Sequence, residues 1–113
     1  MKASRATSDL RGRESVERWI STVDAMYHLS DEEWAPRLEV LAAFCAATGA
    51  DPDRMVVEAR ADRRAKDDHL RRLKRFAGER HSPGSREAHD AENVVRSFLI
   101  HNGARVFVRP YEL

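Results

Sequence analysis

The segment LEVLAAFCAATGADPDRMVVEARAD, residues 38–62, decides the fold of this chain. Its first half carries almost no charge, because Glu39 is the only charged residue before Gly49. A helix so lightly charged is expected in the middle of a bundle, surrounded by other helices. Gly49 provides a left-handed residue to end this helix, and Asp51 with Pro52 provides the N-cap and first-turn proline of the next. The segment therefore predicts two helices joined by a sharp turn.

The residues before this segment predict one further helix. Apolar residues recur there at spacings of three and four, so they share one face, and the helix should end near Leu29. Ser15 or an earlier polar residue can cap its start. The residues of the shared face are Val16, Trp19, Ile20, Val23, Met26 and Tyr27.

The start of the lightly charged helix is open to two interpretations. Ser30 and Glu33 fit a capping box, whereas Pro36 is best tolerated in the first helical turn. We predict a turn across residues 30–34 and a helix from about residue 35. After the sharp turn, the sequence predicts helices over about residues 52–60, 65–79 and 85–102, and Gly103 terminates the last of them.

These elements predict one all-α domain, a bundle of four or five helices. Residues 1–12 form a flexible arm, residues 13–104 the helical domain, and residues 105–113 an extended tail or linker. The single cysteine, Cys45, cannot form an internal disulfide and is expected to be buried and reduced. The predicted core comprises Leu41, Phe44, Cys45, Phe98 and Leu99.

Charge is segregated along the chain, although the formal net charge is only +1. Residues 30–59 hold seven acids and two bases, for a net charge of −5, and residues 60–80 hold nine bases and four acids, for a net charge of +5. Four basic residues of the second segment project from the polar face of the helix predicted at 65–79. That face is either a surface for phosphate groups or an ordinary solvated helix face. Its candidate contact residues are Arg71, Arg72, Lys74 and Arg75.

Other kinds of site receive little support from the sequence. The five histidines are scattered, and neither they nor the cysteine occur at the paired spacing of a zinc site. There is no glycine-rich phosphate loop, so we expect neither a metal nor another cofactor. No run of residues is apolar enough for a membrane span, and the first 20 residues are too polar for a secretory signal. The expected location is the cytoplasm.

Two segments resemble a known family. The first is residues 38–62, through the pattern of Leu41, Phe44, Thr48 and Gly49, with Val56, Val57 and Ala59 following. The second is VVRSFLIHNGARV, residues 94–106. Together they resemble the core-binding domain of tyrosine recombinases and phage integrases, a small SAM-like helical bundle. The resemblance covers about residues 15–108.

The resemblance implies a domain that forms half of a clamp around duplex DNA, while a separate catalytic domain forms the other half. The family's DNA-facing positions correspond here to Trp34, Arg37, Ser85, Arg86 and His89. This chain departs from the family by placing carboxylates nearby, at residues 31–33 and at Glu87, Asp90 and Glu92. Carboxylates repel phosphates, so these positions oppose tight binding of DNA by the domain alone.

Catalysis by this chain is not expected. His69 and Arg72 in HLRR, with Tyr111 later, imitate the order of the family's catalytic residues. However, Leu70 and Leu73 make HLRR part of an ordinary amphipathic helix. The predicted function is a non-catalytic DNA-binding module whose partners are duplex DNA and a recombinase catalytic domain or other recombinase subunits. The alternative is a helical protein-interaction module that has lost the DNA surface. The candidate DNA-binding residues are Arg37, Arg71, Arg72, Lys74, Arg75, Arg86 and His89.

Overall fold

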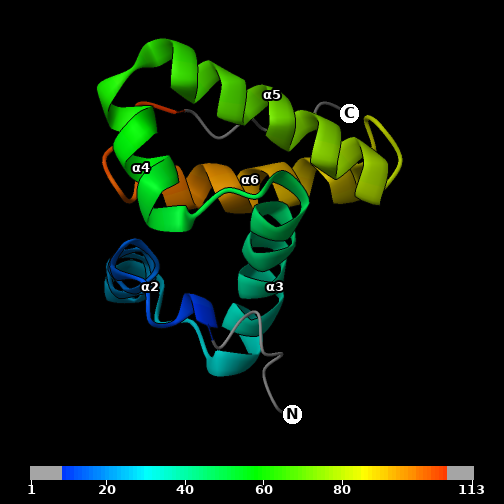
Figure 1. Cartoon of the computed structure of the whole chain (residues 1–113). Helices are drawn as coiled ribbons and strands as arrows, with labels where there is room; N and C mark the ends of the chain where they lie inside the picture. Colours follow the sequence, from blue (N-terminus) through cyan, green and yellow to red (C-terminus); the bar gives the residue numbers. More distant parts are fainter. Residues whose placement is uncertain (1–8, 107–113) are drawn as a thin grey trace.

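The computed structural model of the chain describes residues 9–106. These residues form helices α2 (Glu14–Tyr27), α3 (Asp31–Thr48), α4 (Pro52–Ala61), α5 (Arg63–Arg80) and α6 (Arg86–Ile100), and no strand occurs among them. In Figure 1, α5 and α6 run across the upper half of the molecule, α3 descends steeply from them, and α2 is seen almost end-on. The predicted all-α class is therefore confirmed.

The turn between α3 and α4 forms as the sequence predicts. Gly49 adopts the left-handed conformation at φ 74°, and its N–H donates to the carbonyl of Cys45 at 2.8 Å. The side chain of Asp51 then accepts from the backbone N–H of Arg54 at 3.0 Å, with Pro52 as the first residue of α4. The chain thereby turns between Thr48 and Pro52, and α4 packs against α5 and α2.

The predicted start of α3 at about residue 35 is wrong. The helix begins at Asp31, and Ser30 and Glu33 form the full capping box, with each side chain accepting from the other residue's backbone N–H. Pro36 lies one turn inside the helix, where the missing N–H costs a single intrahelical bond. The earlier start places Trp34 in the core, where its indole N–H donates to Asp24 at 2.8 Å.

Aromatic side chains form the centre of the core. Trp19 lies edge-on to Trp34 and to Phe98, with ring centroids 5.0 and 5.6 Å apart. Phe44 packs in the same manner against Phe76 at 5.5 Å. Leu41, Phe44, Phe98 and Leu99 are all fully buried, so these four members of the predicted core are confirmed.

Two expectations about α3 need correction. Cys45 is only partly buried, packed against the edge of the core. The helix is also not surrounded, because Glu39, Ala46 and Ala47 are exposed along one side. Alanine is apolar but small, so a run of alanines lowers the charge of a helix without requiring burial of every face.

The apolar face predicted for the first helix extends past the core. Met26 and Tyr27 belong to the predicted face, but they are 53% and 67% exposed. They occupy the last turn of α2, beyond the last buried residue, Val23. His28 ends the helix in the left-handed conformation at φ 52°, and its N–H donates to the carbonyl of Asp24.

Helices α5 and α6 have nearly the predicted bounds. Asp62 caps α5 through the backbone N–H of Arg64 at 3.0 Å, which starts the helix two residues earlier than expected. Gly103, at φ 90°, follows α6 in the left-handed conformation that the sequence predicts. Residues 107–113 of the predicted tail, including Tyr111, lie outside the described residues. No described helix has the length and apolar character needed to cross a membrane.

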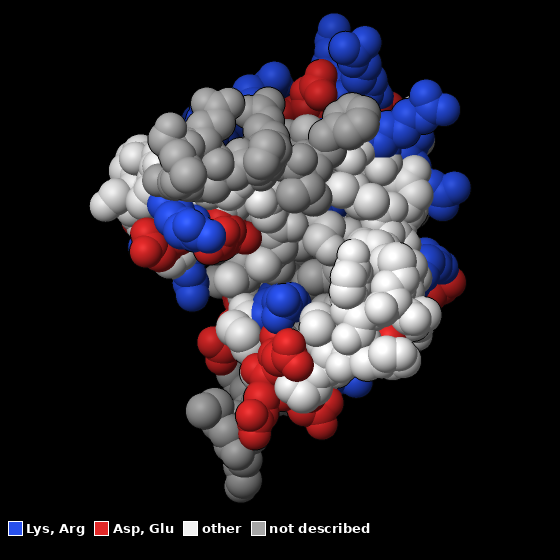
Figure 2. All heavy atoms as spheres, turned by 180° about the vertical axis from the view of Figure 1, so that it is seen from behind, with Lys and Arg blue, Asp and Glu red and all other residues white. Residues whose placement is uncertain are grey.

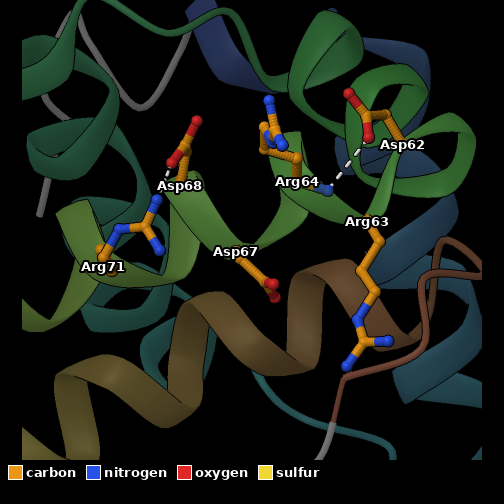
Figure 3. A pocket seen from close by; sticks show the side chains of 6 residues that line it. All are labelled: Asp62, Arg63, Arg64, Asp67, Asp68 and Arg71. Atoms are coloured by element: carbon orange, nitrogen blue, oxygen red, sulfur yellow. Dashed lines mark hydrogen bonds and ion pairs between the residues drawn. The ribbon is translucent and has the colours of Figure 1, made fainter.

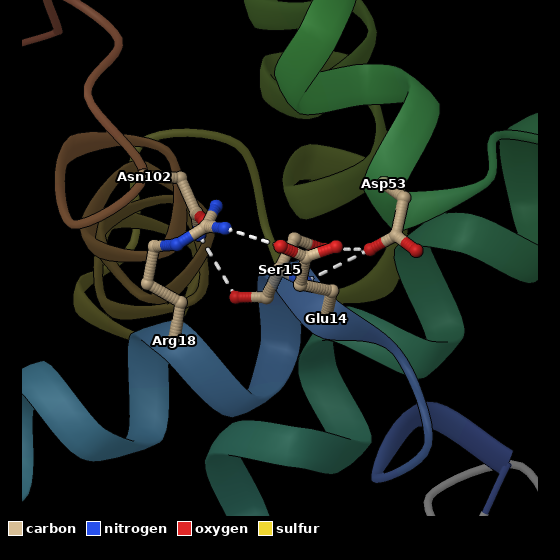
Figure 4. Close-up of polar contacts among 5 residues, drawn as sticks. All are labelled: Glu14, Ser15, Arg18, Asp53 and Asn102. Atoms are coloured by element: carbon tan, nitrogen blue, oxygen red, sulfur yellow. Dashed lines mark hydrogen bonds and ion pairs between the residues drawn. The ribbon is translucent and has the colours of Figure 1, made fainter.

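A polar cluster joins the start of α2 to α4 and α6 (Figure 4). Asp53 of α4 accepts from the backbone N–H and the hydroxyl of Ser15, at 2.9 and 2.5 Å. Asn102, buried after α6, donates from its amide nitrogen to the carbonyls of Ser15 and Phe98, at 3.0 and 2.8 Å. Arg18 donates to the Asn102 side-chain oxygen at 3.0 Å. These bonds hold together elements that are distant in sequence.

A second polar contact joins α4 to α5. The buried ring of His69 lies with Nε2 2.9 Å from a carboxylate oxygen of Glu58, which also pairs with Arg54. The hydrogen bonds from His69 and Arg54 lower the pKa of Glu58 below its ordinary value. Together with Asp62 at the junction, this contact fixes the angle at which α5 leaves α4.

Candidate nucleic-acid interface

The outer face of α5 carries a strip of basic side chains, which we define as Arg64, Arg71, Arg72, Lys74 and Arg75. All five are exposed. At 3.6 residues per turn, Arg64, Arg71 and Arg75 fall on one line along the helix, with Arg72 and Lys74 on either side of it. Leu73, Phe76 and Ala77 anchor the opposite face in the interior. The backbone beneath the strip is therefore held by the core.

Most cations of the strip have no acidic partner in the described part of the chain. Among residues 9–106, Arg72, Lys74 and Arg75 form no ion pair or side-chain hydrogen bond, whereas Arg71 pairs with Asp68 one turn earlier. Arg80, just beyond the strip, lies with its guanidinium 5.9 Å from the centre of the Phe76 ring. Three adjacent cations on one rigid helix thus face solvent with their hydrogen-bond donors available.

Acidic residues interrupt the N-terminal end of the strip. A shallow pocket of about 660 Å³ lies there, lined by Asp62, Arg63, Arg64, Asp67, Asp68 and Arg71. Figure 3 shows Arg71 turned toward Asp68, while Arg63 and Arg64 point in different directions. Because the pocket mixes both signs and its arginines do not converge, it is a weak cradle for a single anion. The stronger phosphate surface is the section from Arg71 to Arg75.

The segregation of charge in the sequence persists on the molecular surface. Figure 2 shows Lys and Arg side chains gathered along the upper edge, over α5, and Asp and Glu gathered at the lower end, where α3 begins. The acidic group at the start of α3 consists of the exposed residues Asp31, Glu32 and Glu33. An approaching polyanion would be attracted to the α5 side and repelled from the α3 end.

The positions taken from the family resemblance do not form one surface. Trp34 is buried, and Ser85 caps α6 by accepting from the N–H of Ala88 at 3.1 Å. Arg37 is half-buried and donates to the carbonyl of Glu33 at 2.6 Å. It lines a groove whose α6 side carries Glu87 and Asp90.

Arg86 and His89, at the start of α6, do not line that groove. Arg86 is exposed, while His89 is half-buried, with its Nε2 3.0 Å from the side-chain nitrogen of Asn93. Arg86, His89 and Asn93 each have an interaction with another residue of the chain. The structure therefore brings together the predicted residues of α5, but not those of α3 and α6.

Sequence reasoning missed part of the basic strip. Arg64 was not among the predicted contacts, because the predicted helix began after it. The signal was present in Asp62, whose side chain caps a helix that begins at the next residue.

Candidates for other chemistry are sparse in the described part of the chain. No three His, Cys, Asp or Glu side chains of residues 9–106 lie close enough together to hold a metal ion. Burial, together with the nearby carboxylate of Asp51, raises the pKa of the Cys45 thiol to about 11. The thiol is therefore protonated at neutral pH and a poor nucleophile.

Comparisons with known proteins identify no relative: no family model matches the chain, and neither a curated protein nor a solved structure matches it significantly.

Proposed function

We propose that this chain is a non-catalytic module that binds duplex DNA, of the kind that tyrosine recombinases carry as their core-binding domain. The observation that carries the proposal is the section of α5 formed by Arg71, Arg72, Lys74 and Arg75, whose last three cations have no acidic partner among the described residues. Guanidinium groups donate to phosphate oxygens in pairs, and each contact releases counterions from the duplex.

The arrangement of the strip supports phosphate contacts rather than reading of bases. Arg64 and Arg75 lie 11 residues apart on α5, about 16 Å at a rise of about 1.5 Å per residue, so the strip is long enough to contact more than one phosphate of a DNA backbone. Contacts to phosphates fix position but carry no sequence information. Binding should therefore be largely independent of sequence and weak, with a dissociation constant of roughly 10⁻⁴ to 10⁻⁶ M.

The order of the elements supports the recombinase setting. A helix that ends at Gly49, a basic helix, and a last helix followed by Gly103 occur in the order that the family resemblance implies. In that setting the partners are duplex DNA and a recombinase catalytic domain or other recombinase subunits, in the cytoplasm. Arg37, Arg86 and His89 would add contacts only where the neighbouring carboxylates are kept from the phosphates.

The alternative function, a helical interaction module without a DNA surface, is favoured by a different observation. Carboxylates occupy the start of α3 and the α6 residues Glu87 and Asp90, where the resemblance places DNA. The two functions differ in a property that is simple to measure, because only the first requires duplex DNA to bind along α5.

The test is titration of a fluorescently labelled 30-base-pair duplex, followed by anisotropy in about 50 mM salt. We expect weak saturable binding by the parent protein. Combined Arg71→Ala, Arg72→Ala and Arg75→Ala substitutions should weaken it at least about tenfold, since three phosphate contacts are lost. Asp68→Asn should tighten binding by a factor of about two to five, because it releases Arg71 from a surface ion pair.

A charge-matched control distinguishes DNA binding by the strip from general electrostatic attraction to the net charge of the protein. Arg11, Arg13 and Arg54 are exposed cations outside α5, and replacing all three by alanine lowers the net charge by the same amount. This control should keep most of the parent's affinity. No binding by the parent protein, or equal losses in both triple variants, would favour the interaction module.

A further inference from the structure

A groove of about 850 Å³ lies between α2, α3 and α6, away from the basic strip. Its apolar lining includes the two core tryptophans, Trp19 and Trp34, together with Val23, Val40 and Val94. Val40 and Val94 are only partly buried, so apolar surface remains open to solvent along the groove. Its volume lies toward the upper end of the range for ligand sites, about 300–1,000 Å³, and leaves room for several large side chains.

The edge of the groove bears residues typical of protein interfaces. Tyr27, which lines it, is 67% exposed at the end of α2, and Pro36 is exposed on the α3 side. Tyrosine is enriched at interfaces because its ring buries a large area while its hydroxyl keeps a polar partner. An exposed tyrosine beside an open apolar groove is what a docking site for a partner protein requires.

The charges around the groove are mainly negative. Glu87 and Asp90 line its α6 side, and both are exposed. Asp31, Glu32 and Glu33 begin α3, whose residues Trp34 and Arg37 also line the groove. Arg37 is the single Lys or Arg of the lining among residues 9–106. The surroundings of the groove therefore complement a positively charged ligand.

We infer that this groove docks a basic amphipathic α-helix of a partner protein. Such a helix would place an apolar stripe, recurring every three or four residues, against Val40, Val94 and Tyr27, above the buried tryptophans. It would direct lysine or arginine toward Glu87 and Asp90. Duplex DNA fits the groove poorly, because a phosphate backbone would meet these carboxylates. The inference rests on the groove alone and stands whether or not α5 binds DNA.

The tryptophans provide a direct readout. Trp19 and Trp34 are the only tryptophans of the chain, and both line the groove, so its occupation should change the intrinsic fluorescence. The probe is a synthetic 18-residue helical peptide with leucines at positions i, i+3, i+4 and i+7 and lysines elsewhere. A second peptide keeps the leucines and carries glutamates in place of the lysines. Neither peptide contains tryptophan.

We expect the leucine–lysine peptide to produce a saturable change in tryptophan emission. It should bind at least about tenfold more tightly than the leucine–glutamate peptide in about 50 mM salt, and the ratio should shrink as salt screens the charges. Absence of a fluorescence response to the basic peptide would overturn the inference. Equal binding of the two peptides would also overturn it, since the partner would then not be selected by charge.

Variants locate the binding site. Glu87→Lys combined with Asp90→Lys changes only exposed residues and should lower the affinity for the leucine–lysine peptide at least about tenfold. Glu39→Lys with Glu79→Lys makes the same change in net charge at exposed residues outside the groove and should leave binding nearly unchanged. Equal effects of the two pairs would contradict docking in the groove. A saturable tryptophan response to duplex DNA that Arg37→Ala abolishes would assign the groove to DNA and also overturn the inference.

Discussion

Asp53 of α4 caps a helix that begins 39 residues earlier in the chain. Its Oδ1 accepts from the backbone N–H of Ser15 at 2.9 Å and from the Ser15 hydroxyl at 2.5 Å. The residue at the N-cap of α2, Arg13, makes no capping bond with its side chain. Asp53 therefore takes over a role that a local Ser, Thr, Asp or Asn usually performs, and in doing so joins α2 to α4.

Loss of this cap should destabilise the domain. We expect Asp53→Ala to lower the free energy of unfolding by about 1–2 kcal/mol, as removal of an N-cap side chain does. Urea unfolding followed by circular dichroism at 222 nm measures the change. Asp68→Ala removes a surface carboxylate whose one partner in the described part of the chain is Arg71, and it should stay within about 0.5 kcal/mol of the parent. Equal stability of Asp53→Ala and the parent would show that the cap is unimportant.

The pKa of the Asp53 carboxylate leads to a prediction of how stability depends on pH. Partial burial raises the pKa of Asp53, but the hydrogen bonds from Ser15 and the charge of Arg13 outweigh this and hold the pKa below its ordinary value. The pKa of Glu58 is lowered as well. Both groups therefore contribute stability that is present above their unfolded-state pKa values, about 4, and is lost as pH falls through the lower folded-state values.

Unfolding free energies measured between pH 7 and pH 2.5 test this dependence. We expect them to decline below about pH 4, because the unfolded chain then binds protons that the folded carboxylates do not. The Asp53→Asn variant should be less stable at pH 7. Its unfolding free energy should fall less steeply at low pH, since one of the carboxylates with a lowered pKa is gone. A parallel decline in the parent and the variant would remove Asp53 from the account.

Replacing a buried apolar residue should destabilise the domain much more than replacing an exposed one. Phe44 is fully buried and packs edge-on against Phe76, so Phe44→Ala should cost roughly 3–5 kcal/mol and could unfold the domain. Val57 is 65% exposed, and Val57→Ala should change stability by less than about 0.5 kcal/mol. Thermal unfolding followed by calorimetry measures the stability of both variants. A Phe44→Ala variant as stable as Val57→Ala would contradict the packing described for α3.

The proposed role as a non-catalytic module predicts that this chain alone neither cleaves nor rejoins DNA. Tyr111 lies outside the described residues, and Tyr111→Phe should leave DNA binding unchanged. Incubation with labelled duplex, followed by denaturing electrophoresis, detects covalent products. A covalent link between Tyr111 and a DNA phosphate would show that the chain has catalytic capacity.

Local signals account for the parts of the fold that the sequence predicted. Gly49, Asp51 and Pro52 each determine the backbone near their own position, so the turn they form could be recognised without knowledge of the rest of the chain. The start of α3 was harder, because Ser30 and Pro36 favour different first turns. Burial of Trp34 is compatible with the earlier start, and that burial depends on contacts with Asp24 and Trp19 from another helix.

Other features depend on tertiary structure that no local pattern contains. Periodicity shows which side of α2 faces the core, but not that the core ends at Val23 and leaves Tyr27 in solvent. The contact between Asp53 and Ser15 joins residues 38 apart. The spacing of Arg71 and Arg75 was enough to predict that both lie on the same face of the candidate interface, because residues one turn apart on a helix always share a face.

The central claim is that α5 binds duplex DNA through phosphate contacts, and the salt dependence of binding tests it most directly. The association constant is measured by anisotropy between about 50 and 200 mM salt for the parent and for the variant with Arg71, Arg72 and Arg75 replaced by alanine. Each phosphate contact contributes about 0.9 to the slope of log K against log salt, so the variant's slope should be shallower by about 2.7. The triple replacement of Arg11, Arg13 and Arg54 should retain the parent's slope. If the parent does not bind at 50 mM salt, or if the α5 variant has the parent's slope, the claim is contradicted.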